Sequence, residues 1–157
     1  MGEMLVKTRQ EVLLTQLESY RDETLHCVAT VTEAEADLIP PGFRNNIRWN
    51  LGHLFLDQYL WIQHLTKEQT PIPDGFREWF GFGTSPADWQ SPPPSLAELK
   101  SLLAEQPRMI RERYGHRLED AFPPIEMGMH TLEHVLVRTI FHEGMHVHAI
   151  LTLRKFI

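Results

Sequence analysis

Four long segments of the sequence repeat apolar residues every three or four positions, which is the spacing of one face of an α-helix. The segments are roughly residues 3–31, residues 45 or 46 to 66, the stretch from residue 95, and residues 127–154. No segment shows the alternation of apolar and polar residues that is typical of a β-strand. Turn residues also do not recur at the close spacing of a β-sandwich or barrel. Four helices in a chain of 157 residues predict an all-α four-helix bundle, with residues 1–157 as one domain.

Short motifs indicate where these helices begin, end and bend. Asn46 is a suitable N-cap for the second helix. TEAE (residues 32–35) and SLAE (residues 95–98) are capping boxes, the first for a short helix and the second for the third long helix. Pro107 is expected to kink or split that helix, because proline lacks a backbone donor and its ring clashes with the carbonyl four residues earlier. In the first helix, the apolar stripe leaves Arg21 on the outer side.

The connection between the second and third helices, about residues 67–94, is long and unusual in composition. Between Thr70 and Pro94 lie six of the eleven prolines and five Phe or Trp residues. A flexible linker would be poor in aromatic residues, so we expect this segment to be ordered and packed on the bundle. An extended chain of this length can cross the bundle, which would make the second and third helices parallel and give up-down-down-up order. The segment either walls a pocket or caps the core.

Charge and composition exclude several classes of partner. A net charge of -6 without a basic cluster argues against nucleic acid. No run of about 18 apolar residues predicts a membrane span, and the first ten residues lack the apolar core of a signal peptide. The single cysteine, Cys27, cannot form an internal disulfide and is expected to be a small buried residue. These features favour a cytoplasmic protein.

The last predicted helix contains HEGMH (residues 142–146), a match to the H-E-x-x-H pattern of helical zinc sites. His142 and His146 are four residues apart, so both imidazoles leave one helical face about one turn apart, as two ligands of one metal would. Val135 and Leu153 lie on the same face, so the pair points into the bundle. Buried imidazoles without partners are costly, and we therefore predict that this pair binds a metal.

A metalloprotease is not expected, because the rest of its ligand pattern is missing. The extended motif requires glycine and histidine at the positions that Ala149 and Thr152 occupy. The best third ligand is His53, because antiparallel second and fourth helices would place it level with His142 and His146. The other six histidines are interpreted as surface or core residues.

Three histidines without a thiolate or a fixed fourth protein ligand predict an open site for one divalent transition metal. Asp57, one turn after His53, either orients His53 or a bound water, or is a solvated carboxylate. Asn50 is a candidate pocket-lining residue on the same helix. Arg138 either meets an anionic substrate or pairs with a carboxylate. Glu143 is either a general base or a residue of the helix surface or of an interface.

Three runs of sequence resemble those of a known family, the DinB/YfiT-like superfamily. NNIRWNLGHLFLDQYLW (residues 45–61) is similar to its N-x-x-W-x-x-G-H-L signature. FHEGMHVHAILTLR (residues 141–154) is similar to its last-helix H-x-x-x-H signature, and FGFGT (residues 80–84) to its F-G-x-G-T element. The resemblance implies an up-down-down-up bundle, often dimeric, in which three histidines bind zinc or nickel. By motif these are His53, His142 and His146.

The resemblance implies a broad range of chemistry. Some members resemble thiol S-transferases, and others are called metal-dependent hydrolases. The leading hypothesis is a metal-dependent enzyme that activates a small-molecule thiol for attack on a small electrophilic substrate. The alternatives are a hydrolase, a non-catalytic bundle that binds a metal or ligand, and an interaction module without metal. After the last ligand the family often shows H-x-G-Q, whereas this chain has V-H-A at residues 147–149.

Overall fold

The computed structural model describes residues 7–157 and confirms the prediction of an all-α fold. Within that range the chain forms four long and two short α-helices and no β-strand, with one isolated bridge between Ala121 and Thr131. The helices are α1 (Thr8–Cys27), α2 (Glu33–Asp37), α3 (Ile47–Thr66), α4 (Phe76–Phe80), α5 (Leu96–Tyr114) and α6 (Leu132–Leu153).

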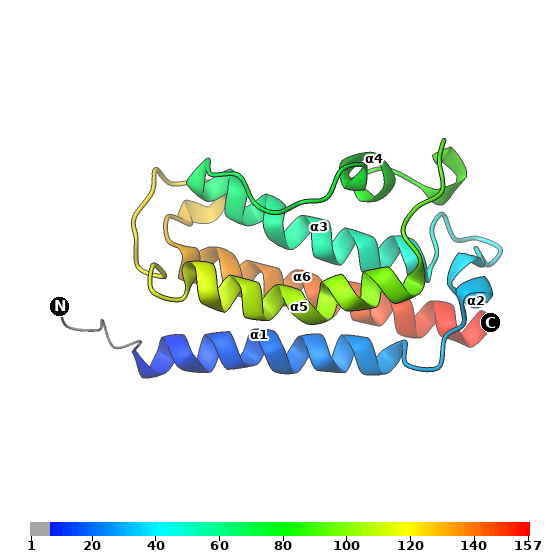
Figure 1. Ribbon diagram of the computed structural model, residues 1–157, viewed down its shortest axis with the longest axis horizontal. Coiled ribbons are helices and arrows are strands. Elements are labelled where there is room, and N and C mark those ends of the chain that lie inside the picture. The colour runs from blue at the N-terminus through cyan, green and yellow to red at the C-terminus, as the bar shows by residue number, and fades with distance from the viewer. Residues whose placement is uncertain (1–6) are drawn as a thin grey trace.

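The four long helices pack lengthwise into one bundle (Figure 1). In Figure 1, α1 and α6 run in one direction, and α3 and α5 run in the other. The segment between α3 and α5 runs back along α3 and carries α4, so that α5 begins near the end of the molecule where α3 begins. Helix α3 packs most extensively on α6. Because these two helices are antiparallel, the first turns of α3 lie next to the last turns of α6.

Helix α3 is the central helix of the structure, and 15 of its 20 residues are buried. The bundle covers one side of it, and the segment between α3 and α5 covers the other. Phe76 and Phe80 of that segment are 2% and 0% exposed, so they belong to the core. The Phe80 ring occupies the space that a Cβ atom at Gly52 would need. Glycine at this position therefore allows α4 to approach the backbone of α3.

The predicted N-caps of α2, α3 and α5 are confirmed. The side chain of Asn46 accepts a hydrogen bond from the Trp49 amide at 2.8 Å, and α3 begins at the next residue. Thr32 and Ser95 each form the predicted capping box, with Glu35 and Glu98 respectively. These side chains satisfy amide groups that the first turn of a helix leaves without partners.

The first helix is shorter than predicted. It ends at Cys27 instead of about residue 31, and its predicted start at residue 3 lies outside the described residues. The next residues include Val28, Thr30 and Val31, and such β-branched side chains lose rotamer freedom in a helix. Thr32 then begins α2, so the apolar spacing continues past the end of the helix itself.

The last helix begins at Leu132, not at about Met127 as predicted. Met127 has a φ of 58°, in the left-handed region, and lies in a short 3₁₀ turn. The side chain of Thr131 accepts a hydrogen bond from the His134 amide and caps α6. The apolar residues before Thr131 fit the helical spacing but belong to the preceding loop.

The prediction that Pro107 would split the third long helix is wrong, because α5 is continuous through it, and a kink at Pro107 stays a prediction. Pro107 has no N–H to donate to the carbonyl of Leu103, four residues earlier. Arg21 of α1 supplies a donor instead, and its Nη1 atom lies 2.8 Å from that carbonyl oxygen. The expectation that Arg21 points outward is also wrong, since it is 1% exposed. A side chain from a neighbouring helix thus replaces the missing backbone hydrogen bond.

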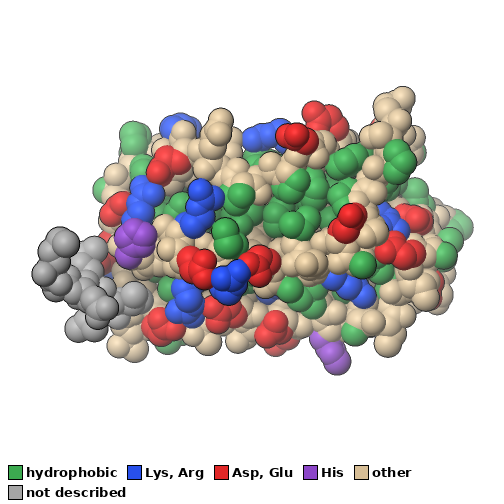
Figure 2. Space-filling model, viewed as in Figure 1, with side chains coloured by type: hydrophobic (Ala, Val, Ile, Leu, Met, Phe, Trp, Pro, Cys, Tyr) green, Lys and Arg blue, Asp and Glu red, His purple; other side chains and the backbone are tan. Residues whose placement is uncertain are grey.

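Basic and acidic side chains are mixed over the face that Figure 2 shows. Between α5 and α1, Arg111 pairs with both Glu11 and Glu18 at 2.8 Å. Such partly exposed pairs contribute at most about 1 kcal/mol each, so the buried contacts between helices account for most of the stability. None of the helices in residues 7–157 is long and apolar enough to cross a membrane.

Candidate metal centre

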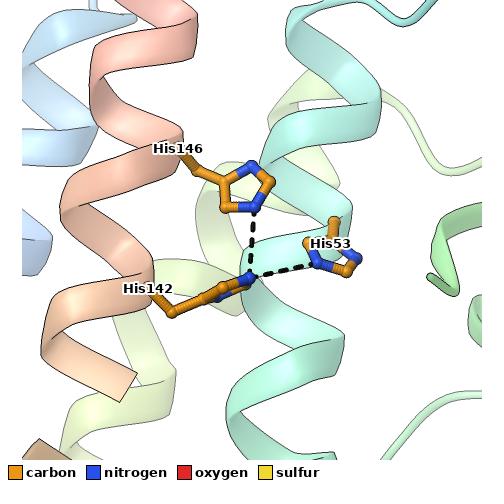
Figure 3. Close-up of side chains that lie close together, drawn as sticks. All are labelled: His53, His142 and His146. Atoms are coloured by element: carbon orange, nitrogen blue, oxygen red, sulfur yellow. Dashed lines mark hydrogen bonds between the residues drawn. The ribbon is translucent and has the colours of Figure 1, made fainter. Parts of the chain in front are cut away.

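Three histidines converge between α3 and α6 (Figure 3). The Nε2 atom of His142 lies 3.3 Å from that of His53 and 3.1 Å from that of His146. One ligand atom from each residue lies within 4.8 Å of the other two, as donors to a single ion would. The structure therefore brings together the three histidines that the sequence predicted as metal ligands.

Packing around His53 fixes the direction of its ring. Asn46 caps α3 and sets the start of the helix, which places His53 in the second turn. The Trp49 ring stacks on the His53 ring, with centroids 4.7 Å apart and planes 8° from parallel. The indole Nε1 of Trp49 donates to the hydroxyl of Thr84 at 2.9 Å, which holds the indole in place. The segment between α3 and α5 thus supports His53 from the side away from α6.

Each histidine turns its second ring nitrogen, Nδ1, towards an oxygen atom. Nδ1 of His53 lies 2.7 Å from the backbone carbonyl oxygen of Phe80. Nδ1 of His146 lies 2.8 Å from Oδ1 of Asn50. Nδ1 of His142 lies 3.1 Å from Oδ2 of Asp57. A carbonyl oxygen only accepts hydrogen bonds, so the contacts of His53 and His146 place their ring protons on Nδ1. The contact of His142 with Asp57 lacks hydrogen-bond geometry, since Oδ2 of Asp57 is buried without a hydrogen-bond partner.

The hydrogen bonds of Asn50 determine which end of its side-chain amide faces His146. Its amide Nδ2 donates to the carbonyl of Asn46 at 2.8 Å and to Oδ1 of Asn45 at 3.3 Å. The amide nitrogen is thereby committed, and the oxygen must face His146. Asn50 is 1% exposed, so this orientation is held inside the bundle.

This arrangement fits a metal ion. With their ring protons on Nδ1, His53 and His146 have no hydrogen to donate from Nε2, and both lone pairs face Nε2 of His142. A divalent cation between the three rings would be coordinated by these nitrogens, and an oxygen partner on the other ring nitrogen is usual for histidine ligands. Neutral imidazoles without thiolates suit zinc, nickel, iron or cobalt.

The surroundings keep His142 and His146 neutral. Burial, together with His146, His53 and Arg138, lowers the pKa of His142 to about 3. Burial and His53 lower the pKa of His146 to about 4. A neutral imidazole is the form that binds a metal, so both residues are in the ligand form at neutral pH.

We expect the metal-free protein to lose stability as the pH falls from about 6.5 towards 4. In this window the unfolded chain protonates His142 and His146, whereas the folded chain does not, so protons favour the unfolded state. Urea unfolding of the chelator-treated protein at several pH values measures this slope. A variant with both histidines replaced by asparagine should show a shallower slope. Equal slopes in the two proteins would contradict the prediction.

A cavity of about 630 Å³ opens over the three histidines. This volume is typical of sites for small molecules. Phe82, in the segment between α3 and α5, lines this cavity and is 97% exposed. The lining combines apolar side chains with a few charged ones. The apolar ones include Trp49, Leu60, Trp61, Phe82 and Met145, and the charged ones include Asp57 and Arg138. The histidine cluster therefore faces a space large enough for a substrate.

The model of the DinB superfamily matches residues 16–150 of the chain. The chain belongs to the DinB superfamily. The match covers most of the sequence and includes all three histidines of the cluster. A comparison with curated protein sequences gave no match. The resemblance noted in the sequence is thus confirmed at the level of the superfamily.

The glycine in the DinB-like N-x-x-W-x-x-G-H-L run has a structural explanation. It is Gly52, which lies directly under the Phe80 ring. The carbonyl of Phe80 accepts the hydrogen bond from His53, the next residue in the run. A single residue of α4, Phe80, therefore both packs on the backbone of α3 at Gly52 and orients His53.

Replacing Gly52 by alanine is expected to lower the free energy of unfolding by about 1–3 kcal/mol. The new methyl group overlaps the fully buried Phe80 ring, which must move and take its carbonyl away from His53. Metal affinity should therefore fall as well. Urea unfolding and calorimetric metal titration measure the two effects. Gly144→Ala is the control, because a Cβ atom there meets nothing within 4 Å.

Two predicted site residues of this DinB protein contact the histidines in ways that differ from the prediction. Asp57 lies beside His142, whereas it was expected to orient His53 or a water. Burial raises the pKa of Asp57, and His53 and Arg138 partly oppose this shift. Asn50 was expected to line the pocket, but it is buried and holds His146 from behind.

Glu143, the glutamate of the H-E-x-x-H match, is not at the helix surface and does not line the cavity. It is 4% exposed, and its Oε1 atom lies 2.7 Å from Nε of Arg21 and 2.7 Å from the hydroxyl of Thr24, both on α1. The expectation of a surface position is wrong. The carboxylate lies at the contact of α6 with α1, about 100° around the helix from His142.

Sequence reasoning did not find the buried polar network around Arg21. Its guanidinium donates to Gln106 at 3.0 Å and to Gln58 at 3.1 Å, in addition to Leu103 and Glu143. The available signal was its spacing, since Arg21 follows the buried Leu17 by four residues on α1. The network joins all four long helices beneath the histidine cluster.

Proposed function

We propose that the protein is a metal-dependent enzyme in which His53, His142 and His146 hold one divalent transition metal, zinc or nickel. The observation that carries this proposal is the convergence of three Nε2 atoms while each Nδ1 faces an oxygen. When bound, such a metal would lower the pKa of a thiol or water at its open position. The reaction proposed first is transfer of a small-molecule thiol to a small electrophile.

A catalytic metal is favoured over a structural one by the donor set and the cavity. The cluster found among residues 7–157 has three protein donors, whereas structural zinc sites usually have four. The cavity adjoins the same histidines and would admit a substrate to the remaining positions. A fourth protein ligand completing the coordination would instead support a non-catalytic metal-binding bundle.

The chain's own residues have separable roles in this proposal. The carbonyl of Phe80 and the side chain of Asn50 hold the rings of His53 and His146 in the tautomer that a ligand needs, and Asp57 lies beside the ring of His142. Asp57 lines the cavity beside His142, whereas Glu126 lies against His64 and Glu143 does not line the cavity. Asp57 is therefore the carboxylate that we assign to take the proton of a thiol or water. Its raised pKa makes it a better proton acceptor than an ordinary aspartate.

The two reactions that this site supports are separated by omitting the thiol. The metal-loaded protein is incubated with monobromobimane and, in turn, with cysteine, glutathione, bacillithiol or mycothiol, and products are identified by mass spectrometry. A conjugate that depends on both metal and thiol supports the transferase. Product that forms equally without thiol would reject the transferase and favour the alternative, a metal-dependent hydrolase. No turnover with a metal-loaded protein would favour a binding bundle.

We also propose that the chain forms the up-down-down-up bundle of its superfamily, with a crossover segment between α3 and α5, and acts as a homodimer in the cytoplasm. The helix directions visible in Figure 1 support the bundle. The outer face of α6 supports the dimer, because Val137, Phe141 and Met145 recur every four residues and are 58%, 65% and 53% exposed. Exposed apolar patches of this kind mark interaction sites.

Replacing Val137 and Phe141 by glutamate should convert the proposed dimer into a monomer. Charged side chains at the centre of an apolar interface would be buried without partners. Light scattering coupled to size-exclusion chromatography gives the mass of each protein at micromolar concentration. Arg113→Glu, at an exposed position of α5, is the control and should leave the mass unchanged. A monomeric wild-type protein would reject the dimer.

A further inference from the structure

Arg138 lies at the histidine cavity and is held there by aromatic rings. It precedes His142 by one turn of α6 and lines the same cavity. Its guanidinium carbon lies 4.8 Å from the centre of the Trp61 ring and 5.9 Å from that of Phe141. Stacking on a tryptophan face orients a guanidinium without using its hydrogen-bond donors.

Arg138 differs from the other arginines of the protein that are at least half-buried. Arg21, Arg48, Arg111 and Arg117 each form an ion pair with a carboxylate. Among residues 7–157 Arg138 has no such partner, and its Nη1 atom is buried without a hydrogen-bond acceptor. The prediction that it pairs with a carboxylate of the chain is therefore wrong. A buried donor without a partner is costly unless a ligand supplies the acceptor.

Two carboxylates line the same cavity, and each lies against a histidine. Oδ2 of Asp57 lies 3.1 Å from Nδ1 of His142 and, like Nη1 of Arg138, is buried without a hydrogen-bond partner. Glu126 lies 3.0 Å from Nε2 of His64. Neither forms an ion pair with Arg138. Their negative charges also disfavour a doubly charged anion in this space, so a group with one negative charge suits the cavity better than a phosphate.

The geometry points to Arg138 as the anchor for a carboxylate group on the substrate of the proposed enzyme. We propose that the cavity takes a small monocarboxylic acid with an apolar body. The fork of a guanidinium matches the two oxygens of a carboxylate. Trp49, Leu60 and Phe82 provide an apolar wall for the rest of the molecule. This inference rests on the proposed function, because it identifies the substrate class of the same site.

The spacing along α6 relates this anchor to the proposed reaction centre. Four residues of helix rise about 6 Å, so a carboxylate on Arg138 would lie about one helical turn from His142. A carbon atom two or three bonds from that carboxylate could then lie closer to the histidine cluster than the carboxylate does. The anchor would therefore present the electrophilic carbon of the acid, not its carboxylate, to the metal centre.

Calorimetric titration of the full-length, metal-loaded protein tests this assignment with two matched probes, 3-phenylpropionate and its neutral amide, 3-phenylpropanamide. The carboxylate should bind about 10- to 100-fold more tightly than the amide. Arg138→Met should remove this preference, Arg138→Lys should retain part of it, and Arg113→Met should leave it unchanged. Direct binding of the carboxylate to the metal would survive Arg138→Met, so a preference that persists in this variant overturns the proposal.

Further titrations test this inference separately from the proposed function. The same titration of the chelator-treated chain should retain the dependence on Arg138, whether or not the metal-loaded protein is an enzyme. Inorganic phosphate should bind more weakly than 3-phenylpropionate, and the reverse order would overturn the assignment to a carboxylate. Absence of binding of either organic probe to the wild-type protein would overturn it too. Thermal unfolding of Arg138→Met shows whether that variant is folded.

Discussion

His53→Ala is expected to give a folded protein that no longer holds one metal ion per chain. The substitution removes one of three converging Nε2 donors and leaves the two of α6. Loss of a group that only orients a ligand costs about 10- to 100-fold in metal affinity, so loss of a ligand should cost more than about 100-fold. Elemental analysis after dialysis against zinc or nickel measures the stoichiometry, and calorimetry measures the affinity.

Two further variants test whether the loss of metal is specific to the loss of a ligand. His148→Ala removes an exposed histidine from the same helix and should bind metal as the wild type does. Asn50→Ala removes the partner of His146 while leaving all three ligands, so its affinity should fall by an intermediate amount, about 10- to 100-fold. If the wild type holds no stoichiometric metal, or if His53→Ala holds as much as the wild type, the metal centre and the proposed enzyme are both rejected.

Arg21→Met is expected to lower the free energy of unfolding by about 3–5 kcal/mol. It leaves the buried carboxylate of Glu143 without its cation and the carbonyl of Leu103 without its donor. Glu143→Gln should cost a similar amount, because Arg21 then lacks its counter-ion. Urea unfolding monitored by circular dichroism gives these values. Arg113→Met, at an exposed site on α5, should change stability by less than about 0.5 kcal/mol.

A second substitution in α5 tests the link between Arg21 and Pro107. Pro107→Ala restores an N–H four residues after Leu103, which is the donor that an α-helix normally provides. In the Arg21→Met background this change should recover about 1 kcal/mol more than it does in the wild type. Equal effects in the two backgrounds would show that the hydrogen bond from Arg21 to Leu103 contributes nothing to stability.

The sequence predicted the helices and the histidine cluster because both depend on regular spacing. Asn46 and Ser95 mark helix starts through local hydrogen bonds that any chain with those residues can form. His142 and His146 must share a face whenever the segment is helical, and His53 follows once α3 and α6 are taken as antiparallel. These features need no knowledge of neighbouring side chains.

The sequence did not predict contacts that depend on tertiary packing. Arg21 carries a charge and was placed outside, but its partners come from three other helices. Pro107 was judged from its own helix, whereas the donor that compensates for it comes from α1. The oxygen partners of the histidines include a backbone carbonyl, at Phe80, which no side-chain pattern can reveal.

The oxygen partners of the three histidines differ in how easily evolution can remove them. Asn50 and Asp57 contribute side-chain oxygens, so a single substitution can eliminate either one. Phe80 contributes its main-chain carbonyl, which every amino acid possesses. The hydrogen bond to His53 therefore depends on the path of the main chain and not on which amino acid occupies position 80. As this protein diverges, substitutions should remove the oxygen partners of His142 and His146 first. The hydrogen bond to His53 should persist as long as α4 packs on α3.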